Sequence, residues 1–193
     1  MLKIDWNSVT ESTNDGSRRP PVGGYVLAII SATEKPERQY FRIEWDYHEG
    51  EFAGHNQKNA TMNNWRLPSL FRSYKPAALG MLKHFLLALE KSNRGWTMDR
   101  WNSLPDAQQA PALNGLIFGA VIGEEEYINK DGKIKVRQYI ADTLPAADVR
   151  AGKFEVPALK KLKGSDSSSD PAPAAENTAT TAPVETGVEE CPF

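Results

Sequence analysis

The residues best suited to chemistry in this sequence are basic and aromatic side chains that alternate along one short segment. Lys133, Lys135, Arg137 and Tyr139 occupy every second position, so in a β-strand they share one face. Lysine and arginine neutralise phosphates, and aromatic rings stack on nucleobases whatever the base. The spacing therefore indicates binding of a single-stranded nucleic acid. The alternative is a solvated strand face, on which lysines protect an edge from pairing with other chains.

Basic and aromatic residues recur together elsewhere in the chain. Tyr40 and Arg42 repeat the alternation on an earlier expected strand. Trp65 and Arg66 join a ring to a cation in a loop, where they either line a binding groove or cap a β-barrel. Trp45 instead shares an apolar face with its neighbours and is expected in the core. The candidate DNA-binding residues are Tyr40, Arg42, Lys58, Trp65, Arg66, Lys133, Lys135, Arg137 and Tyr139.

Patterns for catalysis or metal binding are weak by comparison. The three histidines lack ligand-like spacing, and the single cysteine, Cys191, is far from them in the sequence. Glu124–Glu126 is interpreted as a solvated strand end. Asp131-Gly132-Lys133 resembles the D-x-K of some metal nucleases, but a hairpin turn explains it. Since phosphate-loop, dinucleotide and nucleophile-elbow motifs are lacking, we expect no enzyme activity, no cofactor and no metal. A metal-dependent nuclease stays as an alternative.

The elements that must position the candidate residues are visible as periodic segments. Leucines and a phenylalanine at helical spacing predict a helix over 76–92, with Pro76 near its start and Gly95 just past its end. Asn129 to Gly132 predicts a hairpin turn between the last two strands. Alternating or continuous apolar residues predict strands at 24–33, 39–48, 52–61, 116–127 and 133–140.

Three strands, one helix and two strands is the order of the five-stranded OB-type β-barrel, a mainly β fold. In that barrel the helix between the third and fourth strands plugs one end. Other small β-barrels fit a similar order. In the last expected strand, Ile134, Val136 and Ile140 share the face opposite to the basic residues.

The chain of 193 residues divides unevenly in charge. All 23 Lys and Arg residues lie within 1–164 beside 19 of the 25 acids, a net charge of +4, whereas 165–193 has six acids and no base. A basic body suggests a polyanionic partner. We expect a flexible arm over 1–23, an OB-type domain over 24–163 and an interaction tip over 187–193. The Ser-, Pro-, Ala- and Thr-rich linker, 164–186, is expected to be disordered.

Several classes of protein are excluded by composition. One cysteine cannot form an intramolecular disulfide, and apolar runs of signal-peptide or membrane-spanning length are lacking. We therefore expect a soluble, cytoplasmic protein with no membrane partner.

The chain ends with the most specific motif of the sequence. Its last residues join two carboxylates, a stiff proline and a phenylalanine with the terminal carboxylate, which suits a small apolar pocket ringed by Lys or Arg. An ordinary disordered end is the alternative. The candidate partner-binding residues are Glu189, Glu190, Cys191, Pro192 and Phe193.

This ending resembles the acidic tip of bacterial single-stranded DNA-binding proteins, although Cys191 replaces a larger apolar residue and the acid run is two long. The body is similar to the diverged versions of bacteriophages and prophages in 21–26, 49–54, 85–93 and 123–127, together with Asp131-Gly132. The resemblance implies sequence-independent coating of single-stranded DNA by an OB domain, with homo-oligomers, during DNA replication, recombination or repair in the bacterial cytoplasm. It also implies that the tip recruits partner proteins. A protein–protein adaptor is the alternative of another class.

Overall fold

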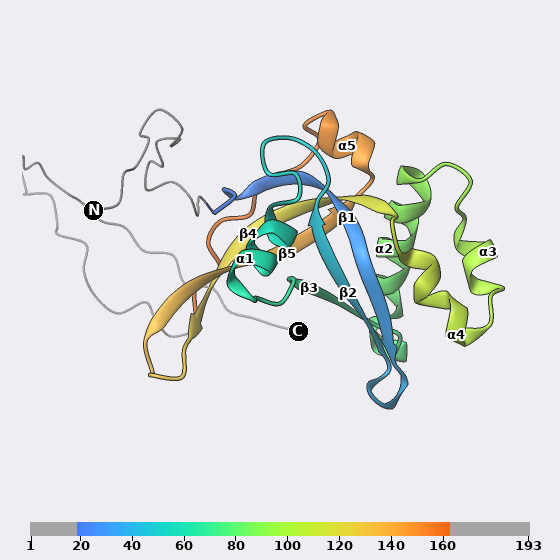
Figure 1. The fold of residues 1–193 in the computed structure, drawn as a ribbon, viewed down its shortest axis with the longest axis horizontal. Helices are drawn as coiled ribbons and strands as arrows, with labels where there is room; N and C mark the ends of the chain where they lie inside the picture. Colours follow the sequence, from blue (N-terminus) through green and yellow to red (C-terminus); the bar gives the residue numbers. More distant parts are fainter. Residues whose placement is uncertain (1–18, 163–193) are drawn as a thin grey trace, which may run out of the picture. The chain divides into compact units, whose positions relative to one another are not determined.

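The computed structural model describes residues 19–162, all within one unit of the chain, Met1–Leu162 (Figure 1). The expected linker and tip lie outside the described residues, as does most of the expected N-terminal arm. The fold is mainly β, as predicted. The described strands are β1 (Gly23–Lys35), β2 (Tyr40–Tyr47), β3 (Ser69–Ser73), β4 (Ile117–Ile128) and β5 (Ile134–Leu144).

Within residues 19–162 the strands form one antiparallel sheet in the order β3-β2-β1-β4-β5. Its terminal strands, β3 and β5, share no ladder with each other in the described part of the chain, so the sheet is open. The described α-helices are α1 (His55–Asn63), α2 (Leu79–Ser92), α3 (Met98–Asn102), α4 (Asp106–Gln109) and α5 (Ala146–Arg150). Short 3₁₀ turns lie at Pro36–Arg38, Pro76–Ala78 and Pro111–Leu113.

The prediction of a third strand over 52–61 is wrong, because that segment enters helix α1. The chain turns at Gly54 with a φ of +72°, a conformation that glycine adopts without strain. The carboxylate of Asp46 on β2 then accepts the N–H groups of Asn56 and Gln57 at 2.8 and 3.0 Å. This cap satisfies N–H groups that have no partner inside the helix. The third strand of the sheet is instead β3, which follows α1.

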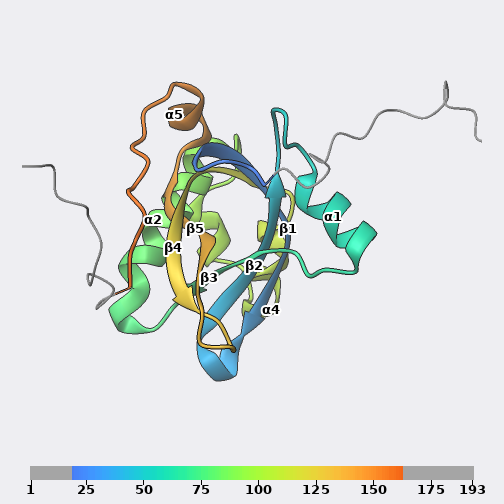
Figure 2. The ribbon, with the colours of Figure 1, turned by 90° about the vertical axis from the view of Figure 1, so that its left-hand side faces the viewer.

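The prediction of a helix between the third and fourth strands is confirmed by α2, but α2 is accompanied by shorter helices. Leu82, Phe85 and Leu89 of α2 are buried against the sheet. The ring of Phe85 meets the ring of Phe118 on β4 edge to face at 5.3 Å. Trp45 lies in the same core at 8% exposure, as predicted. Figure 2 shows α1 and α2 on opposite sides of the strands.

A second, smaller core lies where α5 packs on β1 and β4. Val26, Ala146 and Val149 are buried there. A glycine at position 119 allows the close approach, because a Cβ atom would lie 2.6 Å from Val149 Cγ2 and 2.9 Å from the Leu144 carbonyl oxygen. Both faces of the sheet are therefore covered near its centre.

The far ends of β4 and β5 lie beyond this covered region. Pairing of β1 with β4 ends at Gly23 and Ile122, so the residues from Gly123 onward pair with β5 on one side. We call Gly123–Tyr139, including the turn, the β4–β5 extension; Figure 1 shows it projecting from the sheet. On its other edge the backbone of Lys160 bonds to Glu124 and Glu126 at 2.9 Å. The predicted hairpin turn is confirmed, since the Asn129 side chain accepts the N–H groups of Asp131 and Lys133.

Candidate nucleic-acid interface

A groove of about 420 Å³ separates β3 from β5, the two strands that end the sheet. A smaller cleft of about 160 Å³ shares Trp45, Pro68, Gln138 and Tyr139 with it and continues toward α1. The residues that line the groove are Trp45, Pro68, Ser69, Leu70, Phe71, Glu125, Arg137, Gln138, Tyr139 and Ile140.

The β5 wall of the groove is basic and aromatic. The register pairs Arg137 with Glu125 and Tyr139 with Gly123, which confirms that the two predicted residues share a face. The guanidinium of Arg137 bonds to Glu125 Oε1 at 2.7 Å and lies 5.2 Å from the ring centre of Tyr127. This pairing holds Arg137 at the groove while 59% of its side chain stays accessible.

Two further cations lie on the same face. Lys135 is paired with Tyr127 in the ladder and is exposed. The ammonium of Lys160 lies 5.8 Å from the ring centre of Tyr139 and 3.6 Å from Glu125 Oε2. We call this surface the basic-aromatic face; its members are Tyr127, Lys135, Arg137, Tyr139 and Lys160.

The opposite wall comes from β2 and β3. Phe71 points outward with 55% of its surface exposed, and its ring meets that of Tyr40 edge to face at 5.4 Å. Arg42 bonds to Glu44 at 2.6 Å and donates from Nε to Ser69 Oγ at 3.0 Å. The groove is therefore flanked by the exposed ring of Phe71 on one side and the half-buried ring of Tyr139 on the other. The charge of Arg42 is already balanced by a neighbouring carboxylate.

The remaining predicted residues lie outside the groove. Lys58 is exposed on α1, and not on a strand as its predicted position required. Trp65 is 64% exposed in the loop after α1, with Arg66 exposed beside it. Lys133 lies in the turn of the β4–β5 extension. The structure thus brings Arg137 and Tyr139 together in the groove with Tyr40 and Arg42 close to its other wall.

Phe71, Tyr127 and Lys160 were missed by the sequence analysis. The position of Tyr127 follows from the hairpin turn, because a ladder that closes at Ile128 and Ile134 must pair Tyr127 with Lys135. Phe71 was missed because the third strand was placed too early. Lys160 has no local signal, since the chain returns to β4 from a distant segment.

The acidic residues Glu124–Glu126 are more engaged than the expected solvated strand end. Glu125 holds Arg137 and Lys160, Glu124 lies 4.0 Å from Arg19, and Glu126 accepts the N–H of Leu162. In the part of the chain that the structure describes, no group of three or more His, Cys, Asp or Glu residues is placed to hold a metal ion.

Tyr47 lines the smaller cleft and is buried. Burial raises the pKa of the Tyr47 hydroxyl well above its ordinary value, with the neighbouring Tyr25 adding to the effect. Away from the cleft, burial lowers the pKa of Arg72, whose guanidinium lies 5.4 Å from the ring centre of Phe85 on α2.

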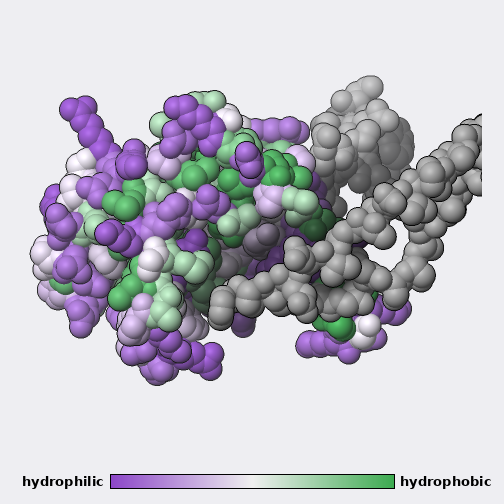
Figure 3. Space-filling view, turned by 180° about the vertical axis from the view of Figure 1, so that it is seen from behind, coloured by the Kyte–Doolittle hydropathy of each residue, from purple (hydrophilic) through white to green (hydrophobic). Residues whose placement is uncertain are grey.

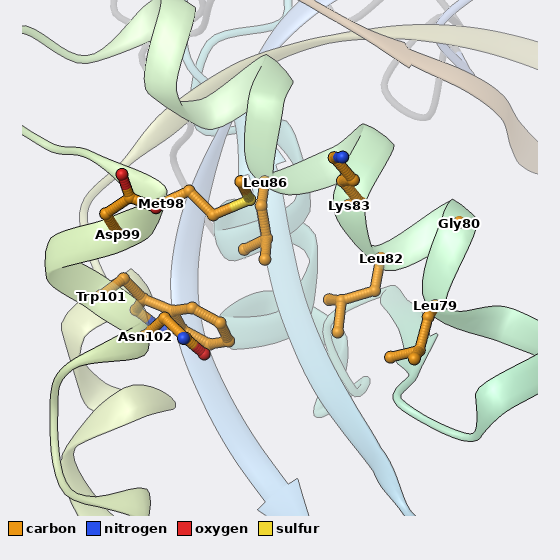
Figure 4. Close-up of a pocket in the computed structure, with 9 residues that line it drawn as sticks. All are labelled: Leu79, Gly80, Leu82, Lys83, Leu86, Met98, Asp99, Trp101 and Asn102. Atoms are coloured by element: carbon orange, nitrogen blue, oxygen red, sulfur yellow. The ribbon is translucent and has the colours of Figure 1, made fainter.

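A separate apolar pocket of about 450 Å³ lies between α2 and α3 (Figure 4). Leu82, Leu86, Met98 and Trp101 supply most of its wall, and Lys83 lies at its edge. Its charged lining residues are Lys83 and Asp99, one from each helix.

Compared with known proteins, the chain matches no protein-family model and has no significant match to a curated protein sequence. Over residues 19–162, no helix is long and apolar enough to cross a membrane. Function must therefore be inferred from the groove and its surroundings.

Proposed function

We propose that this protein binds single-stranded DNA without base preference, in the groove between β3 and β5 and along the basic-aromatic face. The observation behind the proposal is that an exposed ring, Phe71, and a half-buried ring, Tyr139, flank one groove beside exposed cations on β5. Aromatic rings stack bases and cations track the phosphates in sequence-independent binding. The strand order β3-β2-β1-β4-β5 supports an OB-type barrel whose closing seam would be this groove.

The geometry suggests how a strand would be held. Tyr139 and Phe71 offer ring faces or edges to unstacked bases, which a duplex keeps inside its helix. Lys135 offers a cation with an exposed side chain. Arg137 and Lys160 share a single carboxylate, Glu125, so the cluster of Arg137, Lys160 and Glu125 keeps a net positive charge. Phosphates would therefore lie along the β4–β5 extension.

The test is fluorescence anisotropy of labelled oligo-dT with the full-length protein at low and moderate salt, beside a duplex of equal length. We expect salt-sensitive binding to the single strand alone. A combined Phe71→Ala and Tyr139→Ala variant should weaken that binding, while Trp65→Ala, an exposed ring outside the groove, serves as the matched control. Equal binding to duplex, or an equal effect of the two variants, would reject the groove as the site.

The proposal extends to DNA replication, recombination or repair, with partner proteins recruited by the tip, Glu189–Phe193, which lies outside the described residues. Two carboxylates followed by Cys-Pro-Phe suit a basic-rimmed apolar pocket on a partner. Deletion of these five residues should leave oligo-dT binding unchanged and remove capture of the partner.

The adaptor alternative is favoured by one observation, the apolar pocket between α2 and α3. If the body serves as an adaptor, Leu79→Ser, which changes a half-exposed residue of the pocket lining, would disrupt its main interaction and the Phe71/Tyr139 variant would not. The pattern expected for DNA binding is the reverse.

A further inference from the structure

The two faces of the β4–β5 extension differ sharply in chemistry. One is the basic-aromatic face. The other carries Ile128 and Ile134, which are cross-strand partners, and Val136 one pair further in. These side chains are 62%, 55% and 41% exposed. Figure 3 shows apolar surface among hydrophilic side chains at the end of the extension. We call these three residues the apolar strip; their burial would be favourable.

The N-terminal end of the described chain is fixed at the base of this strip. The side chain of Gln138 donates to the carbonyl oxygen of Pro20 at 2.6 Å, and Arg19 lies 4.0 Å from Glu124. Gln138 and Glu124 form a ladder pair two positions before the pair of Glu126 and Val136, so they share the face of the strip. The described part of the chain therefore begins next to the strip.

The direction of the chain also leads toward the strip. Because β1 is antiparallel to β4 and pairs Gly23 with Ile122, the chain that precedes β1 advances along β4 toward Ile128. The edge of β4 is occupied there by Lys160, whose backbone bonds to Glu124 and Glu126. Because Lys160 occupies this edge of β4, the chain that precedes β1 meets the face of the extension that carries the apolar strip.

The composition of the N-terminal segment matches the strip and its surroundings. Between Ile4 and Arg18 the segment is polar except for Trp6 and Val9. Its acids, Asp5, Glu11 and Asp15, lie on both sides of Trp6 and Val9 in the sequence, and the turn of the extension exposes Lys130 and Lys133 beside Asp131. The segment thus supplies apolar side chains for the strip and acids for the lysines of the turn.

The distances agree as well. The strip ends four residues beyond Gln138, roughly 13 Å at the rise of a β-strand. Val9 and Trp6 precede Arg19 by 10 and 13 residues, and flexible chains of that length span about 17–22 Å on average. A tether is most effective when its average length is close to the span.

We propose that Trp6 and Val9 pack on the apolar strip of the same chain, so that the N-terminal segment clasps the β4–β5 extension. A second copy is a poorer occupant, because the strip exposes only a few hundred Å² and a standard interface buries about 800 Å² per partner. The clasp would hold the extension in place and shield the strip from other chains.

The test places a nitroxide spin label on the full-length protein at Ser8→Cys, between Trp6 and Val9, in a Cys191→Ser background. We expect loss of NMR peak intensity at Ile128, Ile134 and Val136. The same label with Trp6→Ser and Val9→Ser should restore most of that intensity, because the label then samples all of the space that its tether allows. Equal loss in the two labelled proteins would contradict packing of Trp6 and Val9 on the strip. A label at Ser103→Cys, directly after α3, serves as the matched control and should spare the strip.

Two results would overturn the clasp. One is full intensity at the strip in the singly labelled protein. The other comes from a mixture of two samples: isotope-labelled protein without a spin label, which is observed, and spin-labelled protein without isotopes. Loss of intensity at the strip in this mixture would mean that a second copy of the chain occupies the strip. The measurement contains no DNA, so its failure is distinguishable from failure of the proposed function.

Discussion

β2 and β5 flank the central pair of strands, β1 and β4, and both alternate apolar with polar residues. On β2 the apolar residues Phe41 and Ile43 are 3% and 0% exposed. On β5 the equivalent residues Ile134 and Val136 are 55% and 41% exposed. Alternation therefore tells which residues share a face, and the surrounding elements decide whether that face is buried.

The physical difference lies in the neighbours. β2 pairs with β1 and β3, and its apolar face packs into the main core with α2. β5 pairs with β4 alone in the described ladders, and its first half extends past the end of β1. One strand thus builds the core, and the other presents both of its faces for contacts.

The largest expected difference is in stability. Ile43→Ala should lower the free energy of unfolding by about 2–5 kcal/mol, because it leaves a cavity in a packed core. Ile134→Ala should lower it by less than about 1 kcal/mol. Urea unfolding of both variants, followed by circular dichroism, measures the two losses. Similar losses would mean that the extension is packed as firmly as the core.

A pair of aspartates gives the next comparison. Asp46 on β2 is 2% exposed and accepts three backbone N–H groups, from Tyr47, Asn56 and Gln57. Asp142 on β5 has a half-exposed side chain and accepts the N–H of Thr143 beside its pairing with His84. Asp46→Ala should cost about 3 kcal/mol, because buried donors lose a charged acceptor.

Asp142→Ala should cost less than about 1 kcal/mol, since water can replace exposed partners. Hydrogen exchange over 55–63 should also rise in Asp46→Ala, because α1 buries no side chain of its own and relies on this cap. Unchanged exchange in α1 would show that the cap is dispensable.

Helix α1 is also an element that the sequence did not predict. β1, β2, α2, β4 and the hairpin turn were predictable because each has its own local period or turn residues. α1 was not, because its N-terminal cap comes from Asp46 on the preceding strand and its sequence has no apolar stripe. The error moved the third strand and hid Phe71.

The candidate site, like the fold, was predictable only where the signal is local in the sequence. The alternation of Arg137 and Tyr139 gave one wall of the groove from local pattern alone. Lys160 was beyond reach, because its place beside Tyr139 depends on pairing with a strand more than thirty residues earlier. The engagement of Arg42 by Glu44 was equally invisible, since residues two apart on a strand need not bond.

Under the proposed function, the ring of Tyr139 should matter more than its hydroxyl. Tyr139→Ala should weaken oligo-dT binding by about 5- to 140-fold, the equivalent of 1–3 kcal/mol for one stacked base. Tyr139→Phe should retain most of the affinity, because the ring is kept. Anisotropy titrations at one salt concentration measure both. If the phenylalanine variant loses as much as the alanine variant, stacking is not the contribution of this residue.

The smallest expected effect is on the salt dependence of DNA binding, and it is tested on two cations, one from β5 and one from β2. Lys135 on β5 is exposed, whereas Arg42 on β2 is bonded to Glu44 at 2.6 Å. Lys135→Ala should flatten the log–log salt dependence of oligo-dT binding by about 0.7, the contribution of one phosphate contact. Arg42→Ala should change the slope less, because its charge is already balanced by a carboxylate. Titrations at four or more salt concentrations give the slopes. A larger change for Arg42 would move the phosphate path from the β4–β5 extension to the outer face of β2.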